Sequence, residues 1–255
     1  MKRIILIVVS FLLIFLFANL IVGGALDAFV DTASMGAGLD ILVGYVASMG
    51  LVIALLWAAK PALNLSFVTL APRIGKVNPS LMLLGLLLIL ISGMAADPII
   101  KLLPSSSLDA LYQMLGTGMW AIVTGVVAAP LMEEYIFRGM LQRSLTVHSS
   151  PILGVIFSAV IFGLIHVIPQ QIVGAMMAGL VLGAIFYLTG SLTTVVVIHL
   201  LNNGLAYLQL LYLGADFDLM TTLFPERGHY IVAVVVAWVV VVLFWVIGMR
   251  KIQKK

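Results

Sequence analysis

Two adjacent carboxylates and one arginine lie in the apolar segment 129–139, whose sequence is APLMEEYIFRG. A charged side chain at the centre of a membrane helix costs at least about 2.5 kcal/mol, so such a cluster indicates a functional site. Glu134 and Arg138 are four residues apart and share one helix face, where they can form an ion pair. Glu133 points about 100° away from Glu134 in a helix of 3.6 residues per turn, which leaves it available for chemistry.

Two further polar pairs with the same four-residue spacing follow in separate apolar segments. Phe162 precedes His166 in the first, and His199 precedes Asn203 in the second. Residues spaced in this way lie on one face of a helix. The sequence therefore predicts three apolar helices that each present a polar face.

A helical hairpin can bring the first two of these faces together. We expect its turn near His148 and the helix that carries Glu133 to continue to about residue 147. With a rise of about 1.5 Å per residue, Glu133 and His166 then lie at depths that differ by only about 5 Å.

These residue types can activate water or bind a metal. One carboxylate and one imidazole in a dry pocket can hold a water molecule and accept its proton. A second imidazole and a carboxamide can then donate hydrogen bonds to the oxyanion that forms when an amide is attacked. Alternatively, Glu133, His166 and His199 supply two histidines and one carboxylate, a ligand set of catalytic zinc. Both alternatives describe hydrolysis of a peptide bond within the membrane, and the residues leave the choice between them open.

The composition predicts the elements that carry these residues. Hydrophobic residues make up 63% of the 255 residues and charged residues 9%, whereas about a quarter of the residues of a soluble protein are charged. We therefore expect an all-α polytopic membrane protein. About eight windows are long enough to cross a bilayer, namely 4–24, 38–58, 80–96, 116–137, 151–167, 171–188, 193–213 and 230–249.

The distribution of basic residues predicts the orientation. Lysine and arginine gather in alternate loops, and the positive-inside rule then places both termini in the cytoplasm. This loop bias accounts for the formal net charge of +3, so we expect no nucleic-acid partner. We expect a multi-pass protein of the bacterial plasma membrane.

The chain divides into three parts by where its polar residues fall. Residues 1–110 form N-terminal transmembrane helices without identified chemistry. Residues 111–215 form the catalytic core helices, and residues 216–255 form an outer loop, the last transmembrane helix and a basic cytoplasmic tail.

Two local features shape the predicted core. Pro130 lacks an N–H group and crowds the preceding turn, so the helix should bend or open just before the carboxylates. Ala175, Gly179 and Gly183 recur at four-residue spacing, which lets their helix pack closely against a neighbour.

Taken together, the three polar blocks resemble the CPBP family of intramembrane proteases. This family includes the CAAX prenyl endopeptidases and bacterial abortive-infection and bacteriocin-processing membrane proteins. Its pattern is Glu-Glu-x-x-x-Arg, Phe-x-x-x-His and His-x-x-x-Asn/Asp. This chain matches the pattern as Glu133-Glu134-x-x-x-Arg138, Phe162-x-x-x-His166 and His199-x-x-x-Asn203.

The resemblance implies a role for each polar residue. Glu133 and His166 would activate the water, and His199 and Asn203 would stabilise the oxyanion. In the metalloprotease alternative, Glu133, His166 and His199 would bind zinc.

The remaining motif residues are expected to support the site. The resemblance implies that Glu134 and Arg138 orient the acidic helix, and Phe162 is expected to pack. The substrate stays open between prenylated proteins, peptide precursors and other membrane proteins.

Two functions of other classes fit the same residues. The carboxylates and histidines could form the proton or cation path of a transporter. A catalytically idle scaffold or immunity protein of the same fold is the third alternative.

Overall fold

The computed structural model describes most of the chain. The described residues are 2–30, 38–67, 78–103, 118–166, 168–214 and 217–253. Within these ranges the regular structure is helical and contains no strand, which confirms the predicted all-α class. The predicted boundaries at 110 and 215 lie outside them.

Seven helices in the described part of the chain are long and apolar enough to cross a membrane. They are α1 (Lys2–Phe29), α2 (Leu39–Leu63), α3 (Pro79–Ile100), a composite helix (Met119–His148), α9 (Pro169–Thr189), α10 (Leu192–Leu213) and the span Arg227–Gly248 within α12 (Arg227–Gln253). A short helix, α11 (Leu219–Leu223), precedes α12. The structure therefore confirms a polytopic membrane protein.

The helix predicted for the fifth window, 151–167, is shorter than expected. Helix α8 (Pro151–Leu164) has 14 residues, because the chain turns at Ile165 and His166 before Pro169 begins α9. The preceding helix is longer than its predicted window of 116–137. It continues to His148, as the hairpin prediction required.

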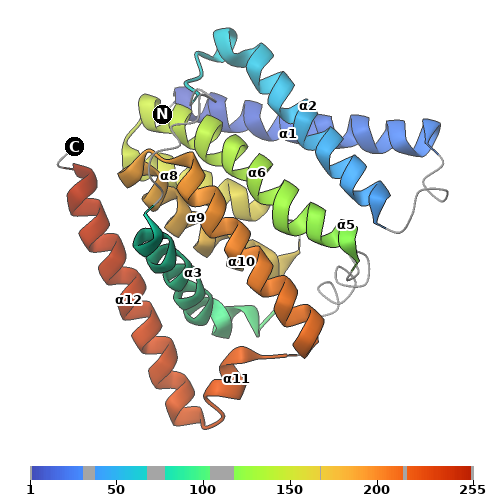
Figure 1. Ribbon diagram of the computed structural model, residues 1–255. Coiled ribbons are helices and arrows are strands. Elements are labelled where there is room, and N and C mark those ends of the chain that lie inside the picture. The colour runs from blue at the N-terminus through green and yellow to red at the C-terminus, as the bar shows by residue number, and fades with distance from the viewer. Residues whose placement is uncertain are drawn as a thin grey trace.

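The composite helix runs through the middle of the molecule (Figure 1). It consists of α5 (Met119–Ala121), η2 (Ile122–Ala128), α6 (Ala129–Glu134), η3 (Tyr135–Gln142) and α7 (Arg143–His148). Helices α1 and α2 contact it from one side and α10 and α8 from the other. Beyond them α9, α3 and α12 pack in succession, so that α12 lies at one edge of the molecule.

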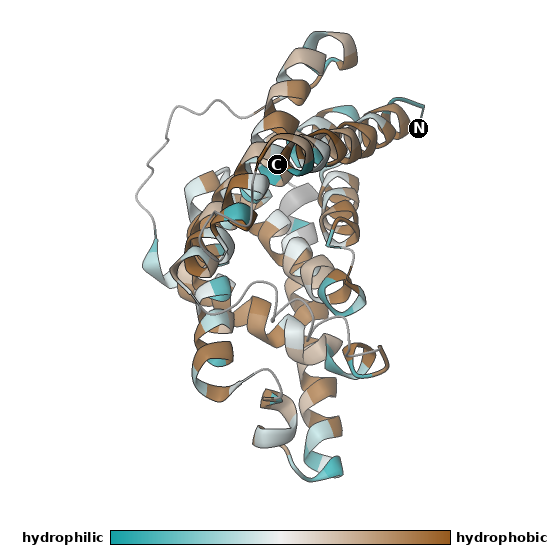
Figure 2. Ribbon diagram, turned by 90° about the vertical axis from the view of Figure 1, so that its right-hand side faces the viewer, coloured by the Kyte–Doolittle hydropathy of each residue, from teal (hydrophilic) through white to brown (hydrophobic). Residues whose placement is uncertain are grey.

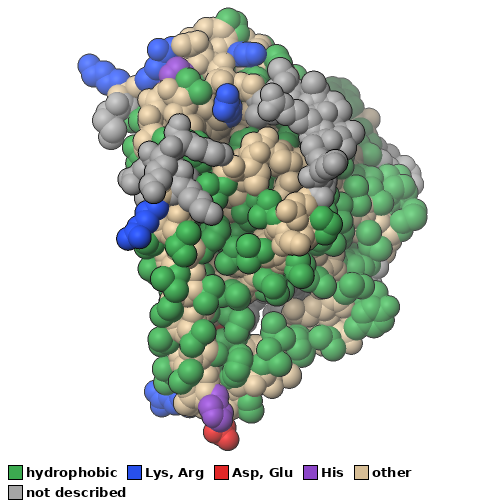
Figure 3. Space-filling model, turned by 60° about the vertical axis from the view of Figure 1, so that its left-hand side comes forward, with side chains coloured by type: hydrophobic (Ala, Val, Ile, Leu, Met, Phe, Trp, Pro, Cys, Tyr) green, Lys and Arg blue, Asp and Glu red, His purple; other side chains and the backbone are tan. Residues whose placement is uncertain are grey.

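Polar and charged residues concentrate at the ends of the helices. Figure 2 shows apolar residues along most of each helix. On the face drawn in Figure 3, most of the visible lysine and arginine side chains lie toward one end, and the visible acidic side chains lie at the other. Helix α1 begins and α12 ends toward the same end of the molecule (Figures 1 and 2). Both termini can therefore lie on one side of a membrane, and their cytoplasmic location stays a prediction.

The helix opens before the carboxylates, as Pro130 predicts. Segment η2 is a π-helix, in which the N–H of Ala129 bonds to the carbonyl of Thr124 five residues earlier. The carbonyl of Gly125 would bond to Ala129 in an α-helix and to residue 130 in a π-helix. Ala129 is engaged with Thr124 and Pro130 has no N–H. The Gly125 carbonyl therefore needs a donor from another element.

Close packing between α8 and α9 depends on glycine. A Cβ atom added to Gly179 would lie 3.1 Å from the Cα atom of Ala159, and one added to Gly183 would lie 2.8 Å from Oε1 of Gln142. The close approach predicted from the spacing of these glycines is confirmed. Both helices can therefore approach the residues of the site directly.

Candidate active site

Glu134 anchors the polar network. Its side chain is fully buried, and its Oε1 atom lies 3.0 Å from Nη1 of Arg138, whose side chain is 1% exposed. The same Oε1 atom accepts a hydrogen bond of 2.8 Å from Nδ1 of His199. A buried charge is tolerated only when it is paired. The ion pair expected from the four-residue spacing is therefore present, and His199 joins it.

Arg138 connects this pair to α8 and α9. Its Nη2 atom donates to the carbonyl of Gly179 at 3.3 Å, and its guanidinium lies 4.5 Å from the ring centroid of Phe162. A cation over an aromatic face is attracted by the ring quadrupole. One arginine thus fixes the composite helix against both neighbouring helices.

Phe162 lies against both imidazoles. Its ring centroid is 5.0 Å from that of His166 and 5.9 Å from that of His199, with edge-to-face geometry in each case. The ring centroid of Phe162 also lies 5.0 Å from that of Phe137. Phe162 is 2% exposed, and it contacts both the histidine in the turn after α8 and the histidine in α10.

His166 lies in the turn that follows α8. Its Nδ1 atom is 2.8 Å from the carbonyl oxygen of Phe162. A carbonyl can only accept, so Nδ1 carries the proton in this contact. In the tautomer with its only proton on Nδ1, Nε2 is an acceptor.

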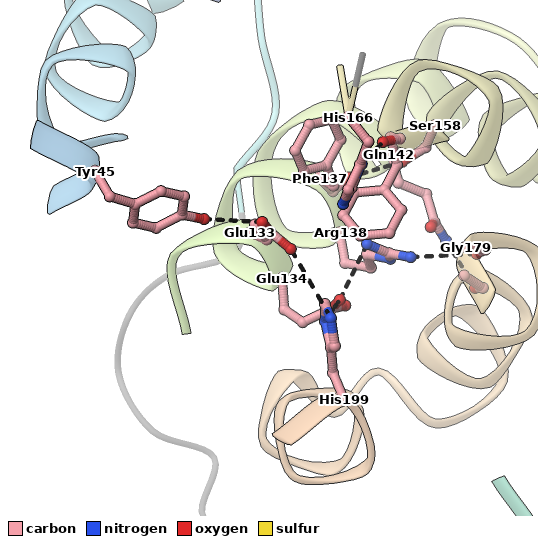
Figure 4. A network of polar contacts seen from close by, with 12 residues as sticks. Tyr45, Glu133, Glu134, Phe137, Arg138, Gln142, Ser158, His166, Gly179 and His199 are labelled. Atoms are coloured by element: carbon pink, nitrogen blue, oxygen red, sulfur yellow. Dashed lines mark hydrogen bonds and ion pairs between the residues drawn. The ribbon is translucent and has the colours of Figure 1, made fainter. Parts of the chain in front are cut away.

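Glu133 faces a different group of partners (Figure 4). Its Oε1 atom accepts a hydrogen bond of 2.8 Å from the hydroxyl of Tyr45 in α2. Its Oε2 atom lies 3.9 Å from Nε2 of His199. With 7% of its surface exposed, Glu133 is buried but less enclosed than Glu134.

Asn203 supports the helix opening next to the carboxylates. Its Nδ2 atom donates a 2.8 Å hydrogen bond to the carbonyl of Gly125, the group that Pro130 leaves without a partner. Its Oδ1 atom accepts from Nδ2 of Asn202 at 3.3 Å. The oxyanion role expected for Asn203 stays a prediction, and the structure gives this residue a structural contact as well.

Six of the seven motif residues belong to one connected network. They are Glu133, Glu134, Arg138, Phe162, His166 and His199. Asn203 lies one helical turn from His199 and contacts η2.

Sequence reasoning missed Tyr45. A single tyrosine in an apolar helix forms no polar block, and only the fold brings α2 to Glu133. The carbonyl of Gly179 was also missed as an acceptor, because backbone groups leave no mark in the sequence.

The residues predicted to bind zinc are not arranged as a metal site. Within the described residues no group of three or more His, Asp or Glu side chains is placed to hold a metal ion. The Nδ1 atoms of His166 and His199 are both engaged in hydrogen bonds. Zinc binding stays a prediction.

Apolar helices around two buried carboxylates and the buried imidazole of His199 define a polytopic membrane protein with a polar site inside its helical core. Residues 115–205 match the family model described as type II CAAX prenyl endopeptidase Rce1-like. The chain therefore carries an Rce1-like domain over these residues, and the resemblance predicted from the three polar blocks is confirmed. The match contains all seven motif residues and leaves α1, α2, α3 and α12 outside it. Comparison with curated proteins gave no match, and comparison with solved structures gave none either.

Proposed function

We propose that this protein is a CAAX-protease-like intramembrane endopeptidase in which Glu133 activates the attacking water. The observation that carries this proposal is the pair of atoms Oε2 of Glu133 and Nε2 of His199, which face each other at 3.9 Å. The Rce1-like match supports the class of reaction.

The hydrogen bond at Nδ1 of His199 explains why water suits this position. Glu134 accepts from Nδ1 of His199, so a neutral His199 has its lone pair on Nε2. A carboxylate also presents only lone pairs, so two acceptors face each other. One water molecule can donate a hydrogen to each of them, and its own lone pairs then point away from both.

The hydrolytic step follows from this arrangement. The water oxygen bonds to the carbonyl carbon of the scissile peptide while its proton passes to Glu133. The carbonyl oxygen becomes an oxyanion, which needs hydrogen-bond donors. When the C–N bond breaks, the proton held by Glu133 passes to the leaving amine.

The contacts and the resemblance assign the histidines differently. The resemblance pairs Glu133 with His166 for water activation and places His199 with Asn203 at the oxyanion. The closest imidazole contact of Glu133 given by the structure is with His199. We therefore propose that His199 helps to hold the water, and that His166 completes the site through its Nε2 atom.

The substrate is proposed to be a peptide or a membrane protein. The site is enclosed by apolar helices, so the scissile bond must reach it from within or beside the bilayer. Prenylated proteins and peptide precursors are the two classes that the resemblance favours. We propose that the protein resides in the bacterial plasma membrane.

The experiment compares processing by wild-type protein and by Glu133→Gln. We propose to reconstitute both in lipid vesicles and to follow peptide and membrane-protein substrates by mass spectrometry. Loss of the general base should lower the cleavage rate at least about 100-fold. Glu226→Gln is the matched control, because Glu226 is exposed and lies before α12.

Two results would overturn the proposal. Equal processing by wild-type protein and Glu133→Gln would favour the scaffold alternative. Proton- or cation-coupled uptake of a solute that is lost in Glu133→Gln, without any cleavage, would favour a transporter.

A further inference from the structure

A tyrosine outside the Rce1-like segment contacts the proposed base. Tyr45 lies in α2, and its hydroxyl donates a 2.8 Å hydrogen bond to Oε1 of Glu133. The matched segment begins at residue 115, so this contact joins a part of the chain that the family model does not cover. Figure 4 shows the tyrosine reaching Glu133 from the side opposite His199.

The hydrogen bond distinguishes the two oxygens of one carboxylate. Oε1 is engaged by Tyr45, and Oε2 faces Nε2 of His199 at 3.9 Å. A glutamate side chain has three rotatable bonds, and ordering them costs free energy. A donor on Oε1 limits this rotation, so Oε2 stays directed at the position proposed for the water.

Other residues in and just after α2 also bind the composite helix. Nε1 of Trp57 donates to the hydroxyl of Tyr135 at 3.2 Å. Just after α2, the backbone N–H of Ser66 donates to Oγ of Ser144 at 3.0 Å. Because these contacts fix α2 without Tyr45, the Tyr45 hydroxyl is not needed to dock the helix.

We propose that Tyr45 is a positioning residue that orients Glu133 for water activation, an inference that rests on the proposed function. With this role for Tyr45, helix α2 contributes to the active site together with the Rce1-like segment. Tyr45 acts through Glu133 and does not itself take up or release the transferred proton.

The test is the removal of one hydroxyl group at each of two positions. Tyr45→Phe removes the donor to Glu133. Tyr135→Phe is the matched control, since it makes the same chemical change and also removes a hydrogen bond between α2 and the composite helix. Cleavage kinetics and thermal unfolding are measured for both variants and for the wild-type protein in lipid vesicles.

A positioning role and a packing role give different results. If Tyr45 orients the base, Tyr45→Phe lowers kcat roughly tenfold while KM stays within about twofold, because the lost interaction matters in the transition state. Tyr135→Phe keeps the wild-type kcat. The two variants lose similar thermal stability, since each loses one hydrogen bond between helices.

Glu133→Gln, measured in the same assay, distinguishes a failure of the positioning role of Tyr45 from a failure of the proposed function. If Glu133→Gln is inactive and Tyr45→Phe keeps full kcat, the positioning role is wrong and the proposed function stands. Equal kcat losses in Tyr45→Phe and Tyr135→Phe also overturn the positioning role. If Glu133→Gln cleaves as fast as the wild-type protein, the proposed function fails, and the role of Tyr45 fails with it.

Discussion

His199 donates a 2.8 Å hydrogen bond from Nδ1 to Oε1 of Glu134, and this contact determines which imidazole nitrogen faces Glu133. The two adjacent carboxylates therefore have different tasks. Glu134 is buried with Arg138 and fixes the histidine. Glu133 faces Nε2 of that histidine and is the proposed base.

This division predicts losses of stability of different size for two adjacent isosteric changes. Glu134→Gln leaves Arg138 buried without its carboxylate, and breaking a buried ion pair costs about 3–5 kcal/mol. Glu133→Gln removes no such pair, and its amide oxygen can still accept from Tyr45. Thermal unfolding in detergent should therefore show a large loss for Glu134→Gln and a small one for Glu133→Gln. Equal losses would contradict the assignment.

Glycine at position 179 should be required for the site. A Cβ atom there would meet Ala159 at 3.1 Å and Phe162 at 3.3 Å, so α8 would have to shift. Gly179→Ala should cost about 1–3 kcal/mol of stability. It should also lower activity, because a displaced Phe162 would shift the two histidines that it contacts. Gly174 in the same helix is the control, because a Cβ atom there meets nothing within 4 Å. Gly174→Ala should leave stability unchanged or raise it by up to about 1 kcal/mol.

Asn203 and Pro130 should be energetically coupled. Asn203→Ala removes the donor to the partly buried Gly125 carbonyl and should cost about 1 kcal/mol, because this acceptor then lacks a partner. Pro130→Ala restores an N–H group near that carbonyl. The cost of Asn203→Ala should therefore be smaller in the Pro130→Ala background, which a double-mutant cycle of unfolding free energies measures. Simple additivity would argue against the proposed compensation.

The charged cluster at the end of α3 should make stability depend on pH. Lys101 lies 2.8 Å from carboxylate oxygens of both Asp97 and Asp218. Partial burial raises the pKa of Asp218, but the hydrogen bonds from Lys101 and Thr221 lower this pKa by a larger amount. The pKa of Asp218 is therefore below its ordinary value. Burial likewise lowers the pKa of Lys101, and its two carboxylate partners raise it above its ordinary value.

The two shifts act in opposite pH ranges. The contribution of Asp218 is present above its unfolded pKa of about 3.9 and is lost as the pH falls through the lower folded value. The contribution of Lys101 is present below about pH 10.4 and is lost as the pH rises through the higher folded value. Because both groups are about one-third exposed, the total effect should stay below about 1 kcal/mol.

A lysine substitution tests this pH dependence. In Lys101→Gln, the loss of stability between about pH 5 and pH 3 should be smaller than in the wild-type protein. Lys60→Gln is the control, since Lys60 lies over the rings of Trp57 and Phe67. The same pH slope in wild-type protein and Lys101→Gln would rule out a contribution of Lys101 to the lowered pKa of Asp218.

Much of the site could be predicted because its residues recur at helical spacing in apolar segments. The ion pair between Glu134 and Arg138 could be predicted from their four-residue spacing. The opening of the helix could be predicted from Pro130, which lacks an N–H group. The predicted end of α8 was about one turn too late, because the mainly apolar sequence continues past Leu164 although the chain already turns at Ile165 and His166. Two contacts could not be predicted, because they depend on how helices distant in the sequence pack together. They are the contact of Tyr45 with Glu133 and the contact of Asn203 with Gly125.

The most direct test of the central claim is a single turnover in water enriched in oxygen-18, with the protein in excess over a cleavable substrate. If water held at Glu133 attacks the peptide carbonyl directly, the new carboxyl group of the product carries one oxygen-18 atom and Glu133 carries none. A first-turnover product without oxygen-18, or label found in Glu133, would contradict direct attack by water.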